Sequence, residues 1–193
     1  MARPRSFDTN VAIEKAMQVF WTLGYEGASL PDLLEGMGLT RGSLYKAFTD
    51  KKTLFLKVLD HYETQAVKAG VALLTDPEIP NGADRIRMLF TSSYQAVTDG
   101  DQRGCLLCTA AAGPSAYDPE IAAAVENGLG QLRDGMAEAL AESPNHETLD
   151  RDARRGLADM LLAQYVGLRT MARARVSDDT LKNAVRSVGV MLT

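Results

Sequence analysis

The sequence predicts an all-α fold of about nine helices, on the basis of three observations. Apolar residues recur at three- and four-residue spacing along most of the chain, which is the pattern of helices with one buried face. Ser, Thr or Asp precedes several of these stretches as a helix cap, and glycine or proline follows them. No alternation of apolar and polar residues is long enough to predict a strand.

The first predicted helix opens at Asp8 or Thr9 and is closed by Gly24. Asp and Thr are favourable N-cap residues, and glycine takes the conformation that ends a helix at little cost. The spacing of the apolar residues between them predicts one buried stripe. Its members are Ala12, Ala16, Val19, Phe20 and Leu23.

A short helix and a tight turn follow. Ser29 can cap this helix, and Pro31 and Asp32 suit its opening turn, where a missing N–H and a negative charge are both favourable. Gly36 and Gly38 can take the positive φ that ends the helix. The buried stripe consists of Leu30, Leu33, Leu34 and Met37.

A second short helix begins after the turn, with Thr40 as its cap and Leu44 and Phe48 on its inner face. The outward positions hold Arg41, Gly42, Ser43, Tyr45 and Lys46. Two short helices joined by a glycine-bearing turn are how a helix-turn-helix protein presents one helix end to the major groove of DNA. The alternative is a helical hairpin inside an ordinary bundle, with Arg41 and Lys46 merely solvated.

A long helix is predicted over residues 50–74, with Asp50 as its cap. The apolar face of its first turns consists of Leu54, Phe55, Val58, Leu59 and Tyr62. Because this helix runs from the first sixty residues into the rest of the chain, we expect two domains, 1–60 and 61–193, joined without a flexible linker.

The remaining residues predict a second helical unit, with loops at 75–82, 113–119 and 143–150. Its last two helices have continuous apolar stripes. The stripe of the first of these consists of Leu157, Leu161, Gln164, Leu168 and Met171, and that of the second, which Ser177 caps, of Leu181, Val185, Val188 and Leu192.

The first sixty residues resemble the N-terminal DNA-binding domain of the TetR (tetracycline repressor-like) family of bacterial transcription regulators. The residues that carry the resemblance are Phe20, Gly24, Tyr25, Ser29, Leu30, Met37, Gly38, the run Arg-Gly-Ser-Leu-Tyr at 41–45, Phe48, Lys51, Leu54 and Phe55. Residues 61–193 are similar to the family in length and helical character, apart from one short stretch around Cys105. The resemblance implies a DNA-binding transcriptional regulator, and among regulators it implies a repressor.

The outward face of the second short helix, together with the resemblance, predicts the DNA contacts. Thr40, Arg41 and Ser43 are candidates for base-edge contacts, since an arginine can bind guanine through two hydrogen bonds. Gly42 allows the backbone to approach the groove closely. Phosphate contacts are expected from Ser29, Tyr45, Lys46 and Lys51. Core packing is the alternative for Tyr45.

The chain has a net charge of −4, so a DNA-binding surface has to be local. Residues 1–60 hold eight Lys or Arg and seven Asp or Glu, and the basic residues gather at the N-terminus, the second short helix and the start of the long helix. Phosphate binding needs a local patch of this kind and not bulk charge. Arg3 and Arg5 form an arm that could enter the minor groove, with a solvated tail as the alternative.

The resemblance implies a homodimer through the last two helices. Their apolar stripes end an already covered bundle, which favours a partner surface, whereas packing of both stripes within one chain is the alternative. A two-fold dimer places two recognition helices on one face of double-stranded DNA and predicts a palindromic operator.

The stretch Arg-Gly-Cys-Leu-Leu-Cys-Thr at 103–109 is the most specific feature of the C-terminal half. Its Gly-Cys-Leu sequence resembles a subset of TetR-like regulators, in some of which the cysteine senses electrophiles or oxidants. We expect Cys105 in the first turn of a short helix, where the helix end and Arg103 lower a thiol pKa. Cys108 could then resolve a sulfenate as a disulfide. Two small buried apolar side chains are the alternative.

A small organic inducer inside the helical bundle is the other effector that the sequence suggests. A lining of tyrosines and one arginine suits a carboxylate or phenolic ligand. The predicted lining consists of Phe90, Tyr94, Tyr117, Tyr165 and Arg169. A metal site is disfavoured, because His61 and His146 give the two cysteines no second ligand pair at zinc-site spacing. No cofactor is predicted.

Other function classes find little support in the sequence. An enzyme would need a nucleophile with its base, a metal constellation or a Gly-rich phosphate loop, and no such motif is present. A protein-interaction module would not need the outward face of residues 40–46 or the arginine arm. Because no apolar run of membrane-spanning length and no secretion signal is found, we expect a cytoplasmic protein with reduced cysteines.

Overall fold

The computed structural model describes residues 7–193, and all regular structure in this range is helical. In chain order the elements are α1 (Thr9–Gly27), α2 (Leu30–Met37), α3 (Arg41–Phe48), α4 (Lys51–Tyr62), a π-helical segment (Glu63–Val67), α5 (Lys68–Leu74), α6 (Gly82–Thr98), α7 (Leu106–Ala111), a 3₁₀ turn (Pro114–Tyr117), α8 (Pro119–Ala141), α9 (Arg151–Arg173) and α10 (Asp178–Met191). The all-α prediction is confirmed, and the described part has nine helices when the continuous run 51–74 is counted as one.

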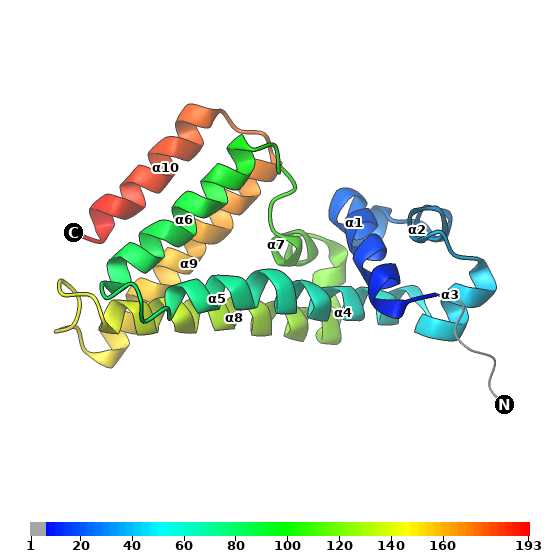
Figure 1. Cartoon of the computed structure of the whole chain (residues 1–193), viewed down its shortest axis with the longest axis horizontal. Coiled ribbons are helices and arrows are strands. Elements are labelled where there is room, and N and C mark those ends of the chain that lie inside the picture. Colours follow the sequence, from blue (N-terminus) through cyan, green and yellow to red (C-terminus); the bar gives the residue numbers. More distant parts are fainter. Residues whose placement is uncertain (1–6) are drawn as a thin grey trace.

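One long helical rod organises the molecule (Figure 1). α4, the π-helical segment and α5 follow one another without a break, and α8 packs beside them. α1, α2 and α3 gather at one end of this rod, whereas α6, α9 and α10 gather at the other, with α7 between the two groups. The rod therefore joins the helix-turn-helix to the bundle without a flexible linker, as the sequence predicts.

Cap geometry confirms the predicted starts of the first four helices. The side chains of Asp8, Ser29, Thr40 and Asp50 each accept a hydrogen bond from a backbone N–H in the first turn of the helix that follows. Ser29 and Asp32 form a reciprocal capping box, in which Ser29 N donates to Asp32 Oδ2 over 2.8 Å. These bonds satisfy N–H groups that have no partner within their own helix.

Of the three glycines predicted to end helices, Gly38 ends α2 and Gly24 kinks α1 three residues before its end. Gly24 and Gly38 have φ values of 75° and 67°, in the left-handed region that favours glycine. Gly36 is instead helical and lies against α1, where an added Cβ would overlap Val19 Cγ2. Its small size therefore permits the close approach of α1 and α2 and does not end α2.

Much of the apolar stripes of the last two helices packs inside the chain, so a dimer through these helices, which stays a prediction, would have to use other residues. Leu161 and Leu168 of α9 and Leu181 and Val188 of α10 are all buried. They are buried because α10 packs against both α6 and α9. The alternative of packing within one chain is the one that the structure supports.

The outward side of α9 instead carries small residues around an exposed methionine. Met160 is 42% exposed, and Ala163 is exposed one turn further on. A Cβ added at Gly156 or Gly167 would meet nothing within 4 Å. This side of α9 is therefore flat and uncovered in the single chain.

Candidate nucleic-acid interface and buried thiol cluster

The N-terminal end of α3 forms a polar surface at one end of the molecule. Leu44 and Phe48 are fully buried, so they hold α3 on the core with its opposite side outward. Thr40 caps the helix: its Oγ1 accepts from Ser43 N over 3.3 Å and donates to Ser43 Oγ over 3.0 Å. The inner and outer faces of α3 are those that the sequence predicts.

The side chains at the outward positions of α3 are accessible. Tyr45 is 44% exposed, which excludes the alternative that it packs in the core. The guanidinium carbon of Arg41 lies 6.0 Å from the centroid of the Tyr45 ring. Lys46 is exposed, and a Cβ added at Gly42 would meet nothing within 4 Å. With no acidic residue between 40 and 46, this surface offers hydrogen-bond donors and positive charge to a groove.

The two lysines that open α4 have different surroundings. Lys51 Nζ lies 4.7 Å from the centroid of the Tyr25 ring, and desolvation lowers its pKa. Lys52 Nζ contacts Asp118 Oδ2 at 2.8 Å and Glu120 Oε1 at 2.7 Å, and these hydrogen bonds raise its pKa. Lys51 thus packs over an aromatic ring, whereas Lys52 joins α4 to the start of α8.

The remaining predicted DNA contacts lie at the start of α2 and in the N-terminal arm. Ser29 Oγ donates to Asp32 Oδ2 over 2.5 Å, so this hydroxyl is already engaged in the cap of α2. Arg3 and Arg5 lie outside the described residues.

A separate group of contacts joins the end of α1 to the rest of the chain. Arg173 Nη1, at the end of α9, donates to Trp21 O over 2.8 Å and to Arg103 O over 3.1 Å. The guanidinium carbon of Arg103 lies 4.1 Å from the Trp21 ring. Glu26 accepts a hydrogen bond from Ser115 N over 2.6 Å. The helix-turn-helix is therefore attached to α9 and to the segments on both sides of α7.

Five side chains near this junction form a group, which we call the thiol cluster; Tyr62 and Cys105 are buried and the other three are half-buried. Its members are Tyr62 of α4, Cys105 and Cys108 at and within α7, and Tyr165 and Arg169 of α9. The Tyr62 hydroxyl donates to Cys105 Sγ over 3.5 Å, and the Cys108 thiol donates to the same sulfur. Cys105 is only 5% exposed. The cluster thus brings two thiols, two phenols and one guanidinium together, with Cys105 the more enclosed of the two thiols.

Hydrogen bonding separates the acidities of the two cysteines. The bond from the Cys108 thiol lowers the pKa of Cys105 to about 6 against the opposing effect of burial, and Tyr62 and Arg169 contribute in the same direction. The bond to Cys105, together with burial, raises the pKa of Cys108. Burial likewise raises the pKa of Tyr62. Cys105 is therefore the more acidic of the two thiols.

The structure corrects two details of the predicted thiol environment. Cys105 is the N-cap of α7 and does not lie in its first turn. Arg103 is paired with Asp101, with Nε 2.8 Å from Oδ1, and stacks on Trp21, so it is engaged elsewhere. The cation that lowers the pKa of Cys105 is Arg169.

The predicted ligand lining separates into two groups. Phe90 and Tyr165 meet edge to face with ring centroids 5.6 Å apart, and Tyr165 adjoins Arg169. Tyr117 is 91% exposed, and the Tyr94 hydroxyl donates over 2.7 Å to the aspartate that opens α10. The first three residues therefore lie with the cysteines, whereas Tyr94 and Tyr117 face elsewhere and are removed from the predicted lining.

Comparison with known proteins agrees with this architecture. The family model of bacterial regulatory proteins of the tetR family matches residues 12–58. The HTH-type transcriptional regulator YezE of Bacillus subtilis (strain 168) is 30% identical over 190 residues, which are 96% of each chain. A cysteine mutant of the TetR family transcriptional regulator CifR, solved with 26-base-pair operator DNA, has a TM-score of 0.83 at 30% identity, over 97% of this chain and 98% of that one. The chain belongs to the TetR family.

The family match runs from within α1 to within α4, and so includes the whole helix-turn-helix. The HTH-type transcriptional repressor ComR of Escherichia coli (strain K12) is 50% identical over 60 residues, which are 31% of this chain and 29% of that protein. This TetR-family chain is accordingly a DNA-binding transcriptional regulator.

Three residues of the junction and the thiol cluster were missed by the sequence reasoning. Tyr62 was assigned only to an apolar face, and Trp21 and Arg173 were assigned no role. Their contacts join residues that are 43 and 152 positions apart, so no local spacing indicates them. The one sequence signal for this junction was the group of arginines near residue 173. The sequence does not identify the carbonyl groups to which these arginines donate.

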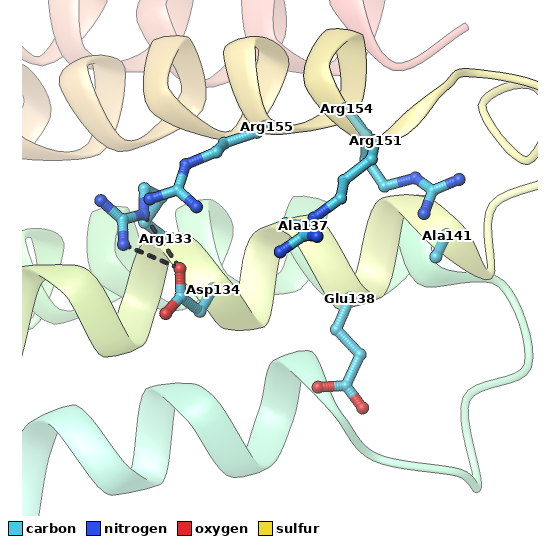
Figure 2. Close-up of a pocket in the computed structure, with 8 residues that line it drawn as sticks. All are labelled: Arg133, Asp134, Ala137, Glu138, Ala141, Arg151, Arg154 and Arg155. Atoms are coloured by element: carbon cyan, nitrogen blue, oxygen red, sulfur yellow. Dashed lines mark hydrogen bonds and ion pairs between the residues drawn. The ribbon is translucent and has the colours of Figure 1, made fainter.

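Arginines also line a cleft of about 350 Å³ between α8 and α9 of this TetR-family chain (Figure 2). They are Arg133, Arg151, Arg154 and Arg155. Arg133 Nη2 pairs with Asp134 Oδ1 at 2.9 Å, whereas the Glu138 side chain points away from the arginines in Figure 2. The outward side of α8 and α9 is therefore strongly charged at this end.

Within residues 7–193, no helix has both the length and the apolar character that crossing a bilayer requires. In the same range, no three His, Cys, Asp or Glu side chains are grouped as metal ligands would be.

Proposed function

We propose that this TetR-family regulator is a homodimeric repressor that binds a palindromic operator and leaves it when an effector acts. The observation that carries the proposal is the exposed end of α3, where Arg41 and the capping hydroxyls face outward among residues without an acid. The similarity to CifR, which was solved on operator DNA, supports this use of the fold. In this proposal residues 1–60 bind DNA in the cytoplasm, and residues 61–193 sense the effector and dimerise.

On the operator, the N-terminal end of α3 enters the major groove. Arg41 binds a guanine through two hydrogen bonds, and the hydroxyls of Thr40 and Ser43 contact neighbouring base edges. Gly42 allows the backbone of α3 to approach the bases. The phosphate contacts come from Tyr45, Lys46 and Lys51, with Arg3 and Arg5 in the minor groove. Ser29 joins them by exchanging its hydrogen bond to Asp32 for one to a phosphate.

The outward sides of α8 and α9 form the proposed dimer interface, in place of the stripes that are buried within the chain. Gly156 and Gly167 leave α9 open to close approach by another helix, and Met160 supplies an exposed apolar centre. A two-fold axis brings the same surface from both copies together. The arginine cleft on this side would then face acidic side chains of the second copy.

The effector acts at the thiol cluster and its surroundings. A small-molecule inducer is the first candidate, because Phe90, Tyr165 and Arg169 offer two aromatic rings and a guanidinium to a carboxylate or phenol. Binding there alters the packing around Tyr62 at the end of α4, and the rod moves α3 relative to its copy. Such coupling is typically worth about 1–3 kcal/mol.

Covalent modification of Cys105 is the second candidate, and the lowered pKa of this thiol favours it. The thiolate can attack an electrophilic carbon directly. With a peroxide, the thiolate attacks the terminal oxygen, the O–O bond breaks and hydroxide or an alkoxide leaves, which gives a sulfenic acid. The Cys108 thiol then displaces water from this sulfur to form a disulfide.

Selection from a pool of random duplexes tests the proposed function. Purified protein should enrich a two-fold symmetric sequence, and its affinity for that sequence should fall steeply with salt because the contacts release counterions. Lys46→Ala should weaken binding to all sequences, whereas Lys182→Ala, on the exposed side of α10, should not. Failure to enrich any sequence, or enrichment of a site without symmetry, would refute the proposal.

A further inference from the structure

We propose that Tyr62 transmits the state of the Cys105 thiol to the DNA-binding end of the chain by moving against Trp21. This inference rests on the thiol-based candidate function and adds the residue through which the thiol would act.

Tyr62 stands where the thiol, the rod and α1 meet. It is the last residue of α4, directly before the π-helical segment, and is only 5% exposed. Its hydroxyl donates to Cys105 Sγ over 3.5 Å. Its ring packs edge-on against Trp21 of α1, with ring centroids 5.1 Å apart and planes at 88°. A single side chain therefore contacts both the reactive sulfur and the first helix of the helix-turn-helix unit.

A group added to Cys105 must displace a neighbour. Cys105, Leu106 and Leu107 are all buried, and Gly104 is so close to α9 that an added Cβ would lie 2.6 Å from Arg169 O. Close-packed interiors accept extra atoms only by moving side chains or backbone. Tyr62 is one of the two neighbours that donate a hydrogen bond to the sulfur, and it is the one that also contacts α1. The π-helical segment directly after it departs from regular α-helical hydrogen bonding, so the rod can adjust there.

Trp21 is able to follow this movement. Its Nε1 is buried and meets no acceptor within residues 7–193, so no hydrogen bond fixes the indole ring in the described part of the chain. The ring contacts both Tyr62 and the Arg103 guanidinium, whose carbon is 4.1 Å from its centroid. Because α1 packs on α2 and α4, a displaced indole shifts the support of the helix-turn-helix.

Methyl methanethiosulfonate is a small reagent that modifies the thiol reversibly. The Cys105 thiolate attacks the sulfenyl sulfur, a new S–S bond forms, and methanesulfinate leaves with the electron pair of the broken S–S bond. Dithiothreitol restores the thiol. Because the chain has two cysteines, Cys108→Ser in every protein leaves Cys105 as the single target, and the serine hydroxyl keeps a donor beside it.

Operator affinity and Trp21 emission are measured before labelling, after complete labelling verified by mass spectrometry, and after dithiothreitol. Trp21 is the only tryptophan, so the emission reports on this position alone. In the parent protein, which carries Cys108→Ser alone, labelling should weaken operator binding by about tenfold and change the Trp21 emission, and dithiothreitol should reverse both effects. Tyr62→Phe removes the hydroxyl and opens space beside the sulfur, so labelling should then change affinity by less than about twofold. Tyr94→Phe, whose hydroxyl bonds Asp178, is the matched control and should respond like the parent.

Loss of the labelling effect in Tyr62→Phe, with its thermal midpoint unchanged, supports the relay. Equal release in Tyr62→Phe and the parent, or release in the parent without an emission change, overturns the relay and leaves thiol control standing. No release in the fully labelled parent overturns thiol control and the relay with it. If Tyr62→Phe does not fold, the Trp21 emission of the parent protein decides the question: a change on labelling supports the relay, and no change overturns it.

Discussion

Arg41 is the residue on which base readout depends most in this account. Arg41→Ala should weaken binding to the selected operator about tenfold and relax the preference at one base pair of each half-site, because a bidentate contact to guanine is worth about 1–3 kcal/mol. Competition with single-base variants of the operator measures both effects. Arg186→Ala, an exposed arginine on α10, is the matched control. Unchanged base preference in Arg41→Ala would remove this residue from the readout.

Cys105 should react at a pH where an ordinary thiol is still protonated. With its pKa lowered to about 6, the thiolate is lost only below that pH. The rate of iodoacetamide labelling should therefore rise through about pH 6 and level off, whereas an ordinary thiol rises near about pH 8.5. Cys108→Ala removes the largest cause of the shift and should move the inflection upward. An inflection near that of a free thiol in the unmodified protein would contradict the assignment.

Residue roles were predictable where they follow from spacing along one helix. Thr40, Leu44 and Tyr45 fall on the expected faces because cap, core and surface alternate with the helical period. The Tyr62–Cys105 contact was not predictable, since it joins residues 43 positions apart. Arg103 was assigned to the thiol, yet an aspartate two positions earlier binds it, a local pairing that the sequence reasoning overlooked.

At the scale of elements, the packing of α1 on α2 depends on the small size of Gly36. Gly36→Ala places a methyl group against Val19, so it should lower the free energy of unfolding by about 1–3 kcal/mol. Gly189→Ala on α10 is the matched control: its Cβ meets nothing within 4 Å, and alanine should raise stability by up to about 1 kcal/mol. Urea unfolding measures both. Equal stability of Gly36→Ala and the parent would mean that α1 and α2 can separate freely.

The outward side of α9 should tolerate no bulky charge if it is the dimer interface. Ala163→Arg should shift the protein towards monomer in sedimentation experiments and weaken operator binding, with its helical content unchanged. Asn183→Arg, at an exposed position of α10, should remain dimeric and serves as the control. Persistence of the dimer in Ala163→Arg would exclude this surface.

Helix starts were predictable because capping is local chemistry, as Asp8, Ser29, Thr40 and Asp50 show. The surface that meets a partner was not predictable in the same way. An apolar stripe indicates that a helix face is buried, but it does not indicate whether the same chain or a second copy covers it. In α10 the stripe is covered by α6 and α9 of its own chain.

At the scale of the whole molecule, one continuous rod links the two functions. Its beginning supports α3, its middle touches the thiol cluster through Tyr62, and its end packs in the bundle. The ion pairs of Lys52 with the start of α8 and the hydrogen bonds of Arg173 to α1 join the helix-turn-helix end of the molecule to α8 and α9. The sequence predicted the rod and the all-α class from periodicity. It could not predict these cross-chain contacts, because they depend on how the helices are placed in space.

Footprinting of the selected operator by hydroxyl radicals, with the number of bound chains measured in parallel, tests the central claim most directly. Two copies that each insert the end of α3 should protect two segments on one face of the duplex, with centres about 10 base pairs or a multiple of this apart, and two or an even number of chains should bind. A single protected segment, or full affinity with one chain per duplex, would contradict the account.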